Sequence, residues 1–466
     1  MKSKIVILVL FLNFVSVAQE HFAGLTNSSR VGIVTIGMNP AELSNLANRI
    51  EINTLGTSIN VANNKIGFND IIAGKNLKDL IFIGNDPVNM RLDAEIYGPS
   101  VALKILKWGL AVTTKANGKL NIVDVDVNLG DALVNKAQND LLTTNGTTIS
   151  NLNNQRLVGT TWGEVGLSLA RAIIDTDNNK FNIGATFKLL FPGSYSNLGI
   201  GAFNGTIYKN TDIVNGNPLN IIYLKDANAN LNFAYSGNLA DSFTNFNDYS
   251  KSIFGELNGF MGDIGVNFQR KDKSVLDVLK NPNKYKLNIG ASIKNIGSMT
   301  FRNDNNYATD YKLNVPSSGI NLEDFADIDN LSQIENKLIA KGVLDKTAAN
   351  KKDFTVKLPT TFVAYADIKI ISKLYVSGYY QKKLTNDADN DQITAQSIIT
   401  VTPRINLGLF EAYIPLSQSE ISGFNAGFGF RLGGFYLGSA SLLSAGFSAE
   451  NSKQADIYTG FRWAFL

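Results

Sequence analysis

Cysteine is absent from the 466 residues, and histidine occurs once, at His21. Without cysteine the chain has no disulfide, no thiol nucleophile and no cysteine metal site. Zinc patterns that need several histidines or cysteines fail as well, and a Ser/His/Asp set would have to use His21. We therefore expect a protein that is not an enzyme and that carries no cofactor.

Charged residues are also few, at 18% of the chain against the usual quarter of a soluble domain. Basic and acidic residues nearly balance, with a formal net charge of +3. A nucleic-acid partner usually requires a basic patch or stripe, so this balance argues against one.

A long apolar run is missing too. Residues 1–18 have the order of a secretory signal peptide, with Lys2 and Lys4, an apolar run and a small-residue cleavage site ending at Ala18. That run is too short for a transmembrane helix, and no later stretch approaches the roughly 20 apolar residues that such a helix needs. The sequence predicts an exported chain that begins at Gln19 and has no membrane-spanning helix.

What the sequence does have is alternation with a period of two residues. In residues 456–466 one face carries Ile457, Thr459, Phe461, Trp463 and Phe465, whereas the other carries polar or small residues. Residues 181–191, 285–294 and 424–432 alternate likewise, with apolar faces that begin at Phe181, Tyr285 and Phe424. Such segments have the length of tilted strands that cross a membrane, with one face toward lipid and the other toward a polar lumen.

Seventeen candidate strands follow from this pattern, among them separate segments at 180–191 and 196–210. A soluble sandwich or propeller also alternates, but the signal peptide, the strand length and a full strand at the C-terminus favour a transmembrane antiparallel β-barrel. Single-chain bacterial barrels have even strand numbers, so we expect about 14 strands, within 14 to 16. We expect it to span residues 49–466, with a long loop at 315–354 that contains a short amphipathic helix near Leu331 to Ile339.

Residues 19–48, before the first strand, do not alternate. They contain Asn39, Pro40, Ala41, Glu42 and Leu43, in which Asn39 suits a helix N-cap and Pro40 the first helical position. This segment is predicted to fold into the lumen as a hatch.

Polar side chains on the inward faces are candidates for tuning a pore, namely Lys188, Lys294, Arg431 and Arg462. Asp387, Asp389 and Asp391 provide oxygen ligands of the kind that calcium prefers, but the rest of a calcium loop is missing. We favour a solvated loop at the cell surface, from Thr385 to Gln392, over a metal site.

The chain resembles the FadL-like outer-membrane transporter superfamily in three places: the Asn39–Leu43 element before the first strand, the Leu358-Pro359-Thr360 sequence before a long strand, and the alternating terminal strand. The stretch that runs from Ser29-Arg30-Val31-Gly32 to Asn64-Lys65-Ile66-Gly67-Phe68 resembles the N-termini of an uncharacterised branch in Bacteroidota. The resemblance implies an outer-membrane barrel of 14 strands with an N-terminal hatch, in contact with outer-membrane lipid, that takes up small hydrophobic molecules.

No ligand-contacting residues of that superfamily can be placed on this chain, and the chain ends in Phe465-Leu466 instead of a terminal aromatic residue. An alternative from another class therefore stays open. The barrel would transport nothing and would serve as a subunit or anchor of a larger outer-membrane secretion or assembly complex, with other outer-membrane proteins as partners and the 315–354 loop as a docking surface.

Overall fold

The computed structural model describes residues 21–28, 31–134, 146–214, 217–237, 255–272, 284–302, 306–325, 328, 330–447 and 452–465. The predicted signal peptide, residues 1–18, lies outside the described residues. In the described part of the chain, no helix is both long enough and apolar enough to cross a membrane.

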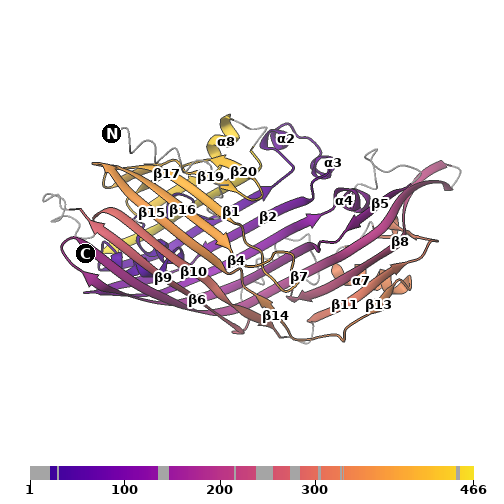
Figure 1. Cartoon of the computed structure of the whole chain (residues 1–466), viewed down its shortest axis with the longest axis horizontal. Helices are drawn as coiled ribbons and strands as arrows, with labels where there is room; N and C mark the ends of the chain where they lie inside the picture. Colours follow the sequence, from indigo (N-terminus) through magenta and orange to yellow (C-terminus); the bar gives the residue numbers. More distant parts are fainter. Residues whose placement is uncertain are drawn as a thin grey trace.

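The strands form a closed antiparallel ring of 14, which confirms the predicted fold class and strand number (Figure 1). The last strand closes the ring on the first, in a register that runs from Ile50 opposite Phe465 to Ala62 opposite Gln454. Three of the ring positions are filled by strands in two pieces, β2 with β3, β18 with β19 and β20 with β21. The ring strands, in order, are β1 (Ile50–Asn63), β2 (Val88–Tyr97) with β3 (Ser100–Ile105), β4 (Trp108–Val125), β6 (Gln155–Asp175), β7 (Asn179–Val214), β9 (Gly259–Lys271), β10 (Tyr285–Phe301), β15 (Thr361–Ile371), β16 (Leu374–Lys383), β17 (Ile398–Asn406), β18 (Phe410–Tyr413) with β19 (Leu416–Ser419), β20 (Gly423–Ala426) with β21 (Phe428–Leu432), β22 (Phe435–Ser439) and β23 (Gln454–Phe465).

The connections differ between the two ends of the ring. At the end where the C-terminus lies, several strands are joined by tight turns, such as 106–107, 372–373 and 433–434. The opposite end carries most of the helices and the strands that are not part of the ring. These elements are α2 (Phe68–Ile72), α3 (Leu77–Ile81), α4 (Val127–Val134), η5 (Leu322–Phe325), α7 (Leu331–Ala340), α8 (Leu442–Phe447), β5 (Thr147–Asn151), β8 (Asn217–Ser236), β11 (Tyr307–Val315), β12 (Ile320–Asn321), β13 (Leu344–Lys346) and β14 (Phe354–Lys357). Helix α7 confirms the helix predicted inside the 315–354 loop.

Strand β7 is 36 residues long and continues past the ring into an extension of the sheet (Figure 1). Its first half pairs with β9, and its second half pairs with β5 and β8. The predicted break between segments 180–191 and 196–210 is therefore wrong. Pro192 lies where the register between β6 and β7 shifts, and such a bulge accommodates a residue that has no backbone N–H.

The extension has a hydrophobic core of its own. Apolar side chains from β5, β7, β8 and β11 pack against α4, η5 and α7, with Phe233, Ile207 and Leu331 among the most buried. The face of the sheet that is exposed on the ring is thus covered by helices on the extension.

On the ring itself, the outward face is apolar and exposed, and the inward face is polar and buried. In β21 Phe428 is 38% exposed, whereas Arg431 is 3% exposed, in agreement with the predicted alternation. Tyr285 is a correction, since it was assigned to the apolar outward face but is buried and donates a hydrogen bond to Asp367. The register of β10 against β9 shifts between Tyr285 and Leu287, which turns Tyr285 inward.

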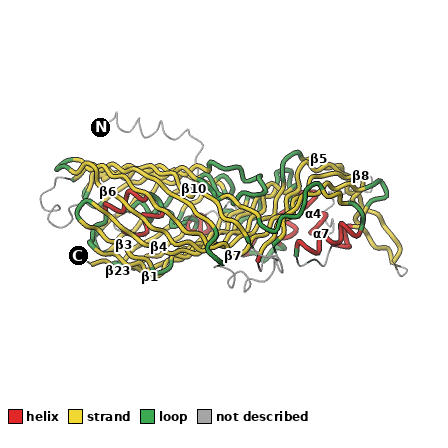
Figure 2. The backbone as a smooth tube through the Cα atoms, turned by 90° about the horizontal axis from the view of Figure 1, so that it is seen from below, coloured by secondary structure: helices red, strands yellow, loops and turns green. Residues whose placement is uncertain are grey.

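Residues 21–28 and 31–46, here called the N-terminal segment, lie inside the ring (Figure 2). They contain two short 3-10 helices, η2 (Gly32–Gly37) and η3 (Pro40–Asn45). The side chain of Asn39 caps η3 by accepting a hydrogen bond from the Ala41 N–H at 2.9 Å, and Pro40 occupies the first turn, as predicted. Leu43 is fully buried in a cluster shared with the barrel wall.

Two wall glycines allow η3 to approach the strands closely. A Cβ atom on Gly184 would lie 2.5 Å from the Pro40 carbonyl carbon and the Ala41 nitrogen, and one on Gly265 would lie 2.1 Å from the side-chain oxygen of Asn39. Side-chain volume at these positions would push the N-terminal segment away from the wall.

We predict that Gly184→Ala destabilises the docked N-terminal segment by about 1–3 kcal/mol, the usual cost of overpacking. The measurements are the temperature at which the folded band disappears on a semi-native gel and the rate of proteolysis within residues 31–46. Gly378→Ala is the matched control, because a Cβ there meets no described atom within 4 Å. Equal behaviour of the two variants would show that η3 is not pressed against this wall.

Candidate functional site

The N-terminal segment is fixed to the wall through one buried carboxylate. Glu42 accepts hydrogen bonds from the amides of Asn267 and Asn288, both at 2.9 Å, and from the hydroxyl of Tyr365. Its second oxygen accepts from Asn45 at 2.8 Å. Because these donors come from β9, β10, β15 and the segment itself, Glu42 joins the segment to three neighbouring strands.

Two further wall carboxylates hold the other side of the segment. Glu51 accepts the backbone N–H of Ile33 at 2.9 Å and pairs with Arg462 at 3.1 Å. Glu411 accepts the hydroxyl of Ser28 at 2.8 Å and pairs with Arg431 at 3.0 Å. Arg431 and Arg462, predicted to face the lumen, do lie inside the ring, but they are engaged in ion pairs that position the segment.

The loop between β16 and β17, residues 384–397, folds back into the ring and is here called the inner loop. Arg156, only 1% exposed, donates to backbone carbonyls of the loop, among them that of Gln392 at 3.1 Å. Tyr195 donates to the carbonyl of Asn390 at 2.7 Å. Asp387 pairs with Arg91 at 3.2 Å and with Lys383 at 2.8 Å, so a buried charge cluster holds the loop in place.

The prediction of a solvated surface loop is therefore wrong for Asp387, which is 5% exposed. Asp389 and Asp391 are exposed, and Asp391 pairs with Lys357. The three carboxylates do not converge, and within the described residues no group of three or more His, Cys, Asp or Glu side chains is arranged to hold a metal ion.

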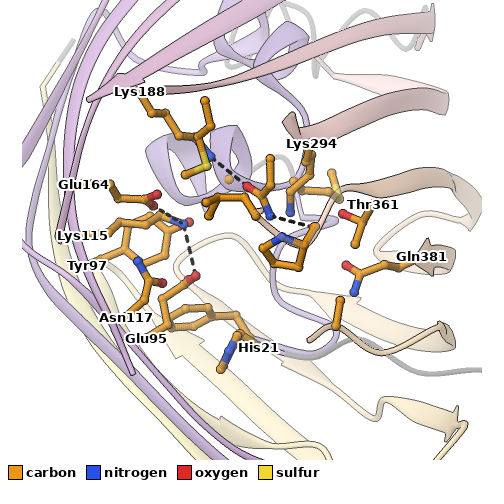
Figure 3. A pocket seen from close by; sticks show the side chains of 18 of the residues that line it. His21, Glu95, Tyr97, Lys115, Asn117, Glu164, Lys188, Lys294, Thr361 and Gln381 are labelled. Atoms are coloured by element: carbon orange, nitrogen blue, oxygen red, sulfur yellow. Dashed lines mark hydrogen bonds and ion pairs between the residues drawn. The ribbon is translucent and has the colours of Figure 1, made fainter. Parts of the chain in front are cut away.

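Between the N-terminal segment and the inner loop lies a cavity of about 100 Å³, here called the chamber (Figure 3). The N-terminal segment contributes Phe22, Val34 and Met38 to its lining, and the inner loop contributes Ala395. Most of the rest comes from inward-facing residues of the strands, with Leu358 and Pro359 from the connection before β15. The lining includes the charged and polar residues His21, Thr26, Glu95, Lys115, Asn117, Lys119, Glu164, Lys188, Lys294, Asn295, Thr361 and Gln381.

Most charges of the chamber are paired across neighbouring strands. Lys115 lies 3.3 Å from Glu95 and 4.0 Å from Glu164, with its ammonium 3.8 Å above the ring of Tyr97. Lys188 pairs with Asp263 at 2.8 Å. Figure 3 shows Glu95, Lys115 and Glu164 on one side of the chamber.

Lys188 and Lys294 were singled out from the sequence, and the structure places both in the chamber lining. Glu95, Lys115 and Glu164 were missed, although they occupy polar positions of recognised strand segments. Their pairing required knowledge of which strands are neighbours. His21 also lines the chamber, and its Nδ1 lies 3.0 Å from the hydroxyl oxygen of Ser58.

These features define a 14-strand antiparallel barrel whose lumen holds a chamber lined by charged side chains. The chain belongs to DUF5723, described as a family of unknown function, whose model matches residues 40–440. Comparison with curated proteins found no match.

Among solved structures, the chain is similar to the toluene transporter TodX of P. putida, with 8% identity over 92% of each chain and a TM-score of 0.41. It is also similar to a Pseudomonas aeruginosa FadL homologue, with 6% identity over 96% of this chain and 98% of that chain, and a TM-score of 0.41. The CymD monoaromatic hydrocarbon channel is 9% identical over 97% and 98% of the two chains, with a TM-score of 0.33. At these values the barrel assignment rests on the strand pairing of this chain itself.

We predict that Asp387→Asn loosens the inner loop, because it leaves the buried Arg91 without its carboxylate partner. Removing one member of a buried ion pair costs up to about 3–5 kcal/mol. Hydrogen exchange of residues 385–396 in the purified barrel measures the effect. Asp389→Asn, at an exposed position of the same loop, should exchange like the wild type; equal protection in all three proteins would contradict the role of Asp387.

Proposed function

We propose that this protein is an outer-membrane β-barrel channel for small molecules, in which the N-terminal segment acts as a hatch. The observation that carries the proposal is a chamber in the lumen of a barrel, bordered on one side by the N-terminal segment and on the other by the inner loop. In this proposal the two segments are closures, and the channel conducts only after one of them moves.

The outward face of the ring supports a membrane location. Large apolar side chains are exposed there on successive strands, for example Leu55 at 51%, Phe187 at 51%, Ile264 at 53% and Trp463 at 52%. Soluble monomers rarely expose apolar patches beyond a few hundred Å². In a lipid bilayer this face is instead the buried one, in contact with acyl chains.

The two ends of the ring support an orientation. Outer-membrane barrels have short periplasmic turns and longer extracellular loops. By this rule the C-terminus and the tight turns face the periplasm, whereas the inner loop and the extension face the cell exterior. The N-terminal segment then closes the periplasmic side of the chamber.

We predict that Ile264→Arg reduces barrel stability by about 2–4 kcal/mol if the residue faces the bilayer core. Ile71→Arg in α2 is the matched control, because Ile71 is exposed to a similar extent, 49% against 53%, but lies outside the ring. Unfolding in urea after reconstitution into lipid vesicles measures both. A soluble barrel would tolerate both substitutions equally, so equal stabilities would refute the membrane location of this strand.

We propose small hydrophobic molecules as the transported class, in line with the resemblance to FadL-like transporters. The names of two similar structures, a toluene transporter and a monoaromatic hydrocarbon channel, support this class without assigning it. Phe22, Met38, Met261 and Leu358 give the chamber apolar surface. The lysines and glutamates beside them add a polar requirement that a pure hydrocarbon does not meet.

We predict that deleting residues 24–45 raises the permeability of vesicles that contain the barrel to small solutes, because the deletion removes the periplasmic closure. Swelling of proteoliposomes in sugar solutions measures the change, and the heat-sensitive gel shift verifies that the ring has closed. Unchanged permeability of a correctly folded deletion variant would remove the hatch from the proposal.

That same outcome would favour a second candidate function, a barrel that transports nothing and anchors or joins a larger outer-membrane complex. The observation in its favour is the extension, whose core of β5, β7, β8, β11, α4 and α7 lies beyond the ring. A sheet with its own packed core projects a rigid surface from the barrel, as docking to another protein requires.

A further inference from the structure

Three residues that line the chamber each carry a buried polar atom with no hydrogen-bond partner among the described residues. The atoms are Thr361 Oγ1, Trp162 Nε1 and Asn117 Nδ2. The indole and the amide nitrogens can only donate, and the hydroxyl can donate. Because buried polar groups in folded proteins are almost always paired, three unpaired donors at one cavity suit a ligand that is rich in acceptors.

Lys294 adds a charge to these donors. It also lines the chamber, and no hydrogen bond or ion pair joins its ammonium to any residue in the described ranges. The neighbouring Lys188, in contrast, pairs with Asp263 at 2.8 Å. Lys294 is therefore a cation that the protein itself leaves without a counter-ion in contact.

The donors occur as two pairs of direct cross-strand neighbours. Lys294 on β10 lies opposite Thr361 on β15, and Asn117 on β4 lies opposite Trp162 on β6. Side chains at directly opposed positions of an antiparallel pair stand on one face with their Cβ atoms about 4.5–5.5 Å apart. Each pair can thus serve one group of a ligand, and Figure 3 shows Lys294 and Thr361 on the side of the chamber opposite Asn117.

The backbone beside Lys294 departs from regular strand geometry. The register between β9 and β10 is interrupted between Ile293 and Ile296, and Asn295 has a φ of 59°, in the left-handed region that asparagine tolerates better than most residues. Asn295 donates its N–H to Asp263 at 2.7 Å and accepts from Lys188 at 3.2 Å. Such bulges occur next to functional sites, where they redirect side chains.

From these observations we propose that the chamber binds a small oxyanion with a single negative charge, such as a monocarboxylate, through Lys294 and Thr361, with Trp162 and Asn117 as donors on the facing wall. The cavity of about 100 Å³ suits a small group. Glu95 and Glu164 on the facing wall share Lys115 and repel a second negative charge. This inference rests on the proposed channel, because it names the chemical class of its cargo.

The test is titration of the purified full-length barrel with sodium acetate at pH 7, followed by calorimetry. Saturable binding is expected, with affinity lowered at least tenfold by Lys294→Gln and several-fold by Thr361→Val. Lys286→Gln is the matched control, because Lys286 lies on the same strand but is exposed. Acetamide, which is neutral, and succinate, which carries two charges, should bind at least tenfold more weakly than acetate.

The proposal is overturned if acetate does not bind saturably, if Lys294→Gln binds it like the wild type, or if acetamide binds equally well. The gel shift verifies that each variant is folded, and Thr361→Val provides the test should Lys294→Gln fail to fold. If the full-length barrel binds acetate but deleting residues 24–45 leaves permeability unchanged, the binding site is retained and the channel is rejected. Increased permeability without acetate binding would retain the channel and reject the site.

Discussion

Closing a sheet into a ring gives every strand an inward face, and the interior of this ring is too narrow to leave that face in bulk water. Each inward polar side chain must then find a partner inside the protein, because an unpaired buried polar group costs about 1–3 kcal/mol. The N-terminal segment and the inner loop supply many of these partners. Glu42 and Asp387 are the clearest cases, since each takes contacts from several strands at once.

The outward face of the sheet is apolar and needs an apolar partner. Strand β7 has a different partner along each of its halves. Along the first half of β7 the outward residues are exposed, with Phe187 at 51%, whereas along the second half Phe203 and Ile207 are buried in the core of the extension. The same apolar periodicity is thus covered by two different partners, lipid in the proposed membrane location and helices beyond it. The shared face explains how a single strand of 36 residues passes from one environment into the other.

The parts of the fold that could be predicted are those that local sequence encodes. Alternation in 181–191 and 456–466 identified ring strands, and Asn39 with Pro40 identified the cap of η3, because strand faces and helix caps depend on residues a few positions apart. The inward fold of the inner loop could not be predicted in this way. Its anchor Asp387 pairs with Arg91, 296 positions away in the sequence, and no local pattern encodes that contact. The same reason hid the roles of Arg431 and Arg462, whose inward direction was evident but whose partners were not.

The two closures of the chamber differ in how much apolar surface they bury, and this difference bears on how the proposed channel would open. The N-terminal segment contributes Phe22, Leu25, Ile33 and Leu43, among others, to a cluster with the wall, and burying such a side chain stabilises by about 1.5–3 kcal/mol each. The inner loop contributes Ile393 to its apolar cluster and is otherwise held by hydrogen bonds and the ion pairs of Asp387. Water at the barrel mouth can replace polar contacts at small net cost, but it cannot replace apolar packing. Displacing the inner loop therefore requires less free energy than displacing the whole N-terminal segment. In the proposed channel, the inner loop is thus displaced before the N-terminal segment.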